Sequence, residues 1–90
     1  VNEADEEVSK GRAAFMEGEV EDAEEAYREA LRMRPGDFGA RYNLAVLLRV
    51  QGRKDEARAL LDKALADPPE GHPELEKAQA LWEKLGGVGS

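Results

Sequence analysis

The sequence contains no cysteine, isoleucine or threonine, and few of its residues are aromatic. Without cysteine, the chain cannot form disulfides or thiolate metal sites. Isoleucine and threonine are residue types that strands favour, and their absence beside 37% charged residues favours helices over sheet. These absences predict an all-α protein.

Side chains suited to catalysis are also scarce. His72 is the only histidine, and Ser9 and Ser90 carry the only hydroxyls besides those of the tyrosines. Because His72 lies where a helix is expected to start, we expect it to act in an exposed loop or a cap. The acidic run from Glu21 to Glu25 has no histidine at metal-site spacing and no calcium-loop pattern. We expect no enzymatic activity, no cofactor and no metal site.

The balance of charge and hydrophobicity limits the classes of partner. A net charge of −7 would repel the phosphate backbone, so nucleic acid is not an expected partner. The longest aliphatic stretch, Leu44 to Leu48, is far shorter than the ~20 residues that span a bilayer. We therefore expect no membrane insertion and no signal-peptide core. Ninety residues with 41% hydrophobic side chains fit one small domain.

A spacing of 34 residues recurs along the chain, and this is the period of a repeat made of two helices. Small residues at fixed positions let helices approach closely, glycine ends a helix, and proline prevents its continuation. The residues that recur are Gly18, Gly52 and Gly86, Ala23 and Ala57, Ala30 and Ala64, and Pro35 and Pro69.

Hydrophobic periodicity and end signals predict five helices. The first is expected at about 3–17 and the second from Glu19 until Pro35-Gly36 stops it. Asp37 is expected to cap a third helix that runs to about Val50. A fourth is expected at 55–66, and a fifth has Pro73 in its first turn, with Gly86 just beyond its end.

These residues resemble the tetratricopeptide repeat family over about 3–85. In the second repeat the resemblance rests on Tyr42-Asn43-Leu44, Gly52, Ala57, Ala64-Leu65 and Pro69, and in the first on Gly11, Gly18, Ala23, Tyr27, Ala30-Leu31 and Pro35. The chain departs from the family pattern at Glu7, Arg41 and Leu75, where a large aromatic is usual, and at Lys10, where an aliphatic residue is usual. The same register gives Ala14, Leu48 and Trp82 one core position, and we expect Trp82 to pack against the fourth helix.

The resemblance implies a right-handed α-solenoid of antiparallel helix pairs with five helices. It divides a single domain, 3–85, into repeat one at about 4–37, repeat two at about 38–71 and a capping helix at about 73–85. The last residues, 86–90, are expected to form a flexible tail. One helix pair cannot cover its own apolar face, so stability is expected to come from stacking, with the fifth helix covering the last repeat.

In this family the first helix of each repeat lines a concave groove, which implies a non-enzymatic scaffold or adaptor that binds a protein or peptide partner. The family's ligand-facing positions carry over to a candidate peptide-binding set: Val8, Arg12, Phe15, Tyr42, Asn43, Val46, Arg49 and Val50. Two arginines among apolar side chains suit a ligand that combines a hydrophobic side chain with a carboxylate or a peptide carbonyl. In the alternative interpretation, the apolar members pack between helices and the arginines form ordinary surface ion pairs.

Two further alternatives remain open at this point. The carboxylate clamp of chaperone-binding family members is mostly missing, because Asn43 and Lys77 fit it but Val8, Arg12 and Pro73 do not. The chain is alternatively a structural segment of a longer solenoid or a self-associating module, so monomer and homo-oligomer both stay open. Its start without methionine is compatible with a mature form that has lost a signal or anchor, and whether the chain is a fragment of a larger protein stays open. The compartment stays open, with the cytoplasm favoured, and the composition hints at a bacterial source.

Overall fold

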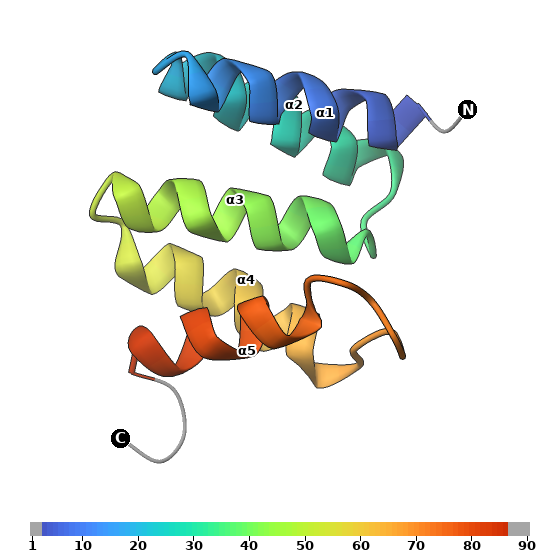
Figure 1. Ribbon diagram of the computed structural model, residues 1–90, viewed down its shortest axis with the longest axis vertical. Helices are drawn as coiled ribbons and strands as arrows, with labels where there is room; N and C mark the ends of the chain where they lie inside the picture. Colours follow the sequence, from blue (N-terminus) through green and yellow to red (C-terminus); the bar gives the residue numbers. More distant parts are fainter. Residues whose placement is uncertain (1–2, 87–90) are drawn as a thin grey trace.

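The computed structural model describes residues 3–86, and within them all regular structure is helical. The five helices are α1 (Glu3–Met16), α2 (Val20–Met33), α3 (Phe38–Val50), α4 (Lys54–Ala66) and α5 (Leu75–Lys84). Figure 1 shows α1, α3 and α5 following one another along the longest axis, with α2 and α4 behind them. The predicted all-α repeat of helix pairs is thus confirmed, while most of the predicted tail, 87–90, lies outside the described residues.

Glycines in the left-handed conformation end three helices at the same place in the repeat. The φ angles of Gly18, Gly52 and Gly86 are 82°, 80° and 89°, a region that residues with a Cβ rarely adopt. The 34-residue spacing of these glycines therefore reflects one backbone requirement met three times. At the opposite end of a helix, Asp37 caps α3 as predicted, because its Oδ1 accepts a hydrogen bond from the Ala40 amide at 3.4 Å.

The fifth helix starts later than the sequence predicts. Pro73 was expected in its first turn, but α5 begins at Leu75. The preceding segment forms a turn in which the Leu75 amide donates to the His72 carbonyl at 3.1 Å and the Glu74 amide donates to His72 Nδ1 at 3.1 Å. The imidazole thus satisfies a helix-start amide, which is the cap role expected for His72.

The helices pack as two hairpins and a final single helix. Helix α1 pairs with α2 and α3 pairs with α4, while α2 and α1 both contact α3, and α5 packs on α4 (Figure 1). The central core lies between these layers. Its largest fully buried side chains are Tyr27, Leu44, Leu47, Leu48 and Leu61. The repeated alanines Ala23, Ala30, Ala57 and Ala64 are buried as well, so the small residues lie where the helices approach most closely.

Ala14, Leu48 and Trp82, which were predicted to share one core position of the repeat, differ in burial. Leu48 is buried, whereas Ala14 and Trp82 are partly buried against the central core. The predicted contact of Trp82 with the fourth helix is confirmed, because the indole Nε1 donates to Asp62 Oδ1 of α4 at 2.5 Å.

Four charged side chains link the two hairpins. Arg53, directly before α4, donates from Nη1 to Glu24 Oε1 of α2 at 3.0 Å. Glu24 also accepts from Arg28 at 2.9 Å, and Glu56 bonds Arg53 at 2.6 Å and approaches Arg28 at 4.0 Å. The second hairpin is thus joined to the first by a closed network as well as by apolar packing.

Candidate functional site

Helix α1 supplies the first predicted binding residues from one face. Val8, Arg12 and Phe15 are spaced by four and three residues, so they lie on neighbouring turns of the same side. Val8 and Phe15 are partly buried against the central core, while Arg12 is exposed. Met16 at the end of this row is 86% exposed, an unusual position for a methionine side chain.

Helix α3 presents the corresponding row one repeat later. Tyr42 and Val46 are partly buried against the core, while Arg49 and Val50 are exposed, Val50 to 59%. The partly buried apolar side chains are therefore compatible with packing between helices and with binding a ligand, since each contributes to the core and leaves part of its surface open. Val50 and Met16 are repeat equivalents, so each hairpin exposes one large apolar side chain at the same place.

Asn43 takes part in the helix itself. Its Nδ2 donates to the carbonyl of Gly39, four residues earlier, at 2.7 Å. The amide nitrogen is thereby engaged with the backbone of α3 and the side chain is partly buried. The structure gives Asn43 a local structural role, and its role in binding stays a prediction.

The arginines of residues 3–86 fall into an ion-paired group and a group without ion pairs, and Arg12 and Arg49 belong to the second group together with Arg34, Arg41 and Arg58. Arg28, Arg32 and Arg53 are all ion-paired. Within residues 3–86, by contrast, neither Arg12 nor Arg49 has an ion-pair partner. In the part of the chain that the structure describes, these two arginines therefore do not form the surface ion pairs of the alternative interpretation, and their role in binding stays a prediction.

A carboxylate that the sequence did not single out lies beside this surface. A Cβ added to Gly39 would lie 3.4 Å from Glu74 Oε1, so the carboxylate that precedes α5 reaches the start of α3. Burial raises the pKa of Tyr42, and the nearby Glu74 carboxylate raises it further. Burial also raises the pKa of Tyr27, with the Arg12 guanidinium opposing that rise and Glu74 adding to it.

Arg12 of the first repeat and Glu74, which directly precedes α5, thus shift the pKa of the same tyrosine, Tyr27, in opposite directions. No sequence signal pointed to Glu74, because it takes the place that Ala40 has one repeat earlier and its approach depends on how α5 docks.

The described residues give little material for bond-making chemistry. In residues 3–86 no three histidine, cysteine or acidic side chains are grouped so that they could hold a metal ion. The ring of His72 packs at 4.8 Å from that of Phe38, and its Nδ1 is occupied by the Glu74 amide. None of the described helices has the length and apolarity needed to cross a bilayer. What this surface offers is exposed apolar area beside unpaired guanidinium groups.

The comparison with known proteins agrees with the repeat seen in the helices. A family model described as tetratricopeptide repeat matches residues 8–72, which include α2, α3, α4 and most of α1. No curated protein matches the chain. The matched region holds every residue of the predicted binding set and ends before α5.

Proposed function

Because the chain belongs to the tetratricopeptide repeat family, a family of protein-interaction modules, we propose that it is a non-enzymatic adaptor that binds a peptide segment of a partner protein. The proposed surface is formed by α1 and α3 and comprises Val8, Arg12, Phe15, Tyr42, Asn43, Val46, Arg49 and Val50. Exposed Met16 extends it at the end of α1.

The observation that carries this proposal is that Arg12 and Arg49, which have no ion-pair partner within residues 3–86, lie on the same helices as the partly buried apolar row. A guanidinium group offers donors in a planar fork that matches a carboxylate. Arg12 and Arg49 project from the two helices that also expose Phe15 and Val46, so a charged group and an apolar side chain of one ligand would be held together. The ligand class is therefore an apolar peptide that bears a carboxylate, either an acidic side chain or a chain end.

The surface also has a built-in polarity. Glu74 supplies negative charge at the start of α3, whereas Arg49 lies in the last turn of the same helix. A bound segment with its carboxylate toward Arg49 avoids repulsion by Glu74. We therefore propose that peptides with a basic or neutral group at one end and an acidic group at the other bind best.

Selection from a displayed library of random peptides tests this function. We expect the wild-type protein to enrich peptides in which a carboxylate accompanies large apolar side chains. In the double variant Arg12→Glu/Arg49→Glu, affinity for the enriched peptides should fall by about ten-fold or more, because two attractive charges become repulsive. Fluorescence anisotropy with one labelled, enriched peptide measures the change.

The matched control is Arg34→Glu/Arg58→Glu, which alters the net charge equally at two exposed arginines outside the proposed surface. Its affinity should stay within about two-fold of wild type. Circular dichroism must show that both variants remain helical. A folded Arg12→Glu/Arg49→Glu variant that binds as tightly as the wild type would refute the site.

A further inference from the structure

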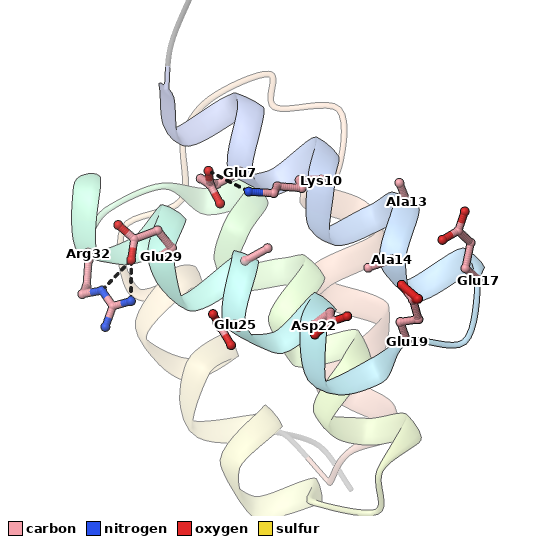
Figure 2. A pocket seen from close by; sticks show the side chains of 11 residues that line it. Glu7, Lys10, Ala13, Ala14, Glu17, Glu19, Asp22, Glu25, Glu29 and Arg32 are labelled. Carbon is pink, nitrogen blue, oxygen red and sulfur yellow. Dashed lines mark hydrogen bonds and ion pairs between the residues drawn. The ribbon is translucent and has the colours of Figure 1, made fainter.

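A concave feature lies between α1 and α2. Its volume is about 580 Å³, and it is lined only by residues of these helices and of the turn that joins them (Figure 2). Three alanines contribute its apolar surface: Ala13, Ala14 and Ala26. We call this feature the α1–α2 groove, and it shares no residue with the proposed peptide-binding surface.

The charge of the α1–α2 groove is mainly of one sign. Its two cations are already neutralised, because Lys10 pairs with Glu7 at 3.7 Å and Arg32 pairs with Glu29. Four further carboxylates, those of Glu17, Glu19, Asp22 and Glu25, have no ion pair or side-chain hydrogen bond within residues 3–86 (Figure 2). The charge that the groove leaves unpaired within the described residues is therefore all negative.

The second hairpin shows what occupies the equivalent place one repeat later. Glu19 and Asp22 correspond to Arg53 and Glu56, which are 34 residues further on. In the structure these two residues meet an α-helix, since Arg53 bonds Glu24 of α2 at 3.0 Å and Glu56 approaches Arg28 of α2 at 4.0 Å. Helix α2 also packs on α3. The face of the second hairpin that corresponds to the α1–α2 groove is therefore occupied by an α-helix, namely α2.

The differences between the two faces define the chemistry of a helix that would fit the groove. Where the inner face has Arg53, the groove has Glu19, so a cation is required where α2 carries Glu24. Asp22 keeps the negative charge of Glu56, so the cation at the place of Arg28 is retained. Both required charges are positive and lie four residues apart, which places them on one helix face.

The apolar part of the groove is also shaped differently. Its residues Ala13 and Ala14 correspond to Leu47 and Leu48, which are fully buried in the second hairpin. Smaller side chains leave room for larger ones on the incoming helix. A helix with leucine-sized side chains would thus bury the alanine surface.

We propose that the α1–α2 groove binds a positively charged amphipathic helix of a partner protein, in the position that α2 takes on the second hairpin. Charge complementarity favours this occupant over a second copy of the chain, whose net charge is −7 and whose own α2 carries Glu24 at the critical place. The same charge disfavours nucleic acid.

A peptide taken from the protein itself provides the probe. A fluorescein-labelled peptide with the α2 sequence Val20–Met33 carries the substitutions Glu21→Lys, Glu24→Lys and Glu25→Lys, so its net charge becomes positive while its apolar residues are kept. Titration with the 90-residue protein, followed by anisotropy, should show saturable one-to-one binding. The unmodified α2 peptide should bind at least about ten-fold more weakly. A scrambled peptide with the composition of the cationic peptide should be weakened to the same extent.

Two protein variants locate the binding. Glu19→Lys/Asp22→Lys should lower the affinity for the cationic peptide by about ten-fold. Asp55→Lys/Glu70→Lys makes an equal charge change at exposed residues elsewhere and should lower this affinity by less than about two-fold. The Arg12→Glu/Arg49→Glu variant should bind it at least as well as the wild type, which separates this groove from the proposed peptide surface.

Four results would overturn the proposal. The first three are a titration that does not saturate, an equal loss of affinity in the two lysine variants, and equal binding of the scrambled peptide. The fourth is a concentration-dependent dimer that Glu19→Lys/Asp22→Lys abolishes. The last would assign the groove to a second copy of the chain.

Discussion

The tightest requirement on a single residue falls on Gly11, in the middle of α1. A Cβ added there would lie 2.5 Å from Tyr27 Cε1 and 2.7 Å from Cδ1, closer than real side chains approach. Tyr27 is 1% exposed, so its ring has no free space into which to move. A glycine normally weakens a helix interior, and here its lack of a side chain lets the aromatic ring of α2 lie against the α1 backbone.

Alanine substitutions at two helical glycines should therefore have opposite effects. We expect Gly11→Ala to destabilise the fold by about 1–3 kcal/mol, because the clash with Tyr27 exceeds the gain in helix propensity. In Gly39→Ala the new Cβ meets only the flexible Glu74 carboxylate at 3.4 Å and Asp37 Oδ1 at 3.5 Å. That variant should be stabilised by about 0.5–1 kcal/mol. Urea unfolding measures both, and stabilisation of both proteins would contradict the packing of Tyr27.

At the scale of the element, α5 acts as the cover of α4. It buries Ala78 and Leu81 and holds Asp62 of α4 through the Trp82 indole. The opposite side of α5, including Ala80, is exposed. A short helix with one apolar side is only marginally stable alone, so its order depends on this contact.

A matched pair of alanines tests that cover. Ala78→Asp should release α5 at a cost of at least about 2 kcal/mol, because an unpaired carboxylate would be buried. Ala80→Asp introduces the same side chain at an exposed position of the same helix and should cost about 1 kcal/mol or less, because only helix propensity is lost. Thermal unfolding by circular dichroism gives the comparison, and light scattering should detect aggregation of Ala78→Asp alone. Equal melting temperatures would show that α5 does not stabilise the second hairpin.

The sequence predicted the elements well because their ends depend on local backbone needs. Gly18 and Gly52 end helices wherever the repeat requires a left-handed residue, and the packing of Trp82 on α4 follows from register alone. The pairing of Glu24 with Arg53 and the approach of Glu74 to α3 depend on how separate hairpins dock, which no local pattern records. The predicted binding residues on α1 and on α3 could be placed on one face of each helix, because helix periodicity is a local pattern. Their ligand stays a prediction.

For the whole molecule, the charged network between the hairpins couples stability to pH. Burial alone would raise the pKa of Glu24, but hydrogen bonds from Arg28 and Arg53 outweigh it and hold the pKa below its ordinary value. The hydrogen bonds that Arg53 donates to Glu56 and Glu24 raise the pKa of Arg53. A depressed carboxyl pKa means that the ionised group stabilises the folded state above its unfolded-state pKa, and that this contribution is lost as pH falls through the folded-state pKa.

Acid unfolding should therefore depend on Glu24. Below about pH 5 the free energy of unfolding of the wild type should fall, and Glu24→Gln should show a lower free energy at neutral pH with a flatter acid limb. Glu29→Gln, which removes a carboxylate paired only with Arg32 of its own helix, serves as the control and should keep the wild-type slope. Urea titrations at several pH values provide the data. A Glu24→Gln protein with the wild-type pH slope would show that the network adds no pH-dependent stability.

The position of Trp82 makes its fluorescence specific to the packing of α5 on α4. It is the single tryptophan of the sequence, and its indole lies where the last helix is seated on α4. The fluorescence of Trp82 therefore reports whether α5 is packed on α4, whereas far-ultraviolet circular dichroism averages over all five helices. Neither proposed interaction surface contains an indole, so a spectral change on adding a tryptophan-free peptide signals movement of the final helix rather than occupancy of those surfaces. The chain thus carries an intrinsic optical reporter at the end of its stack.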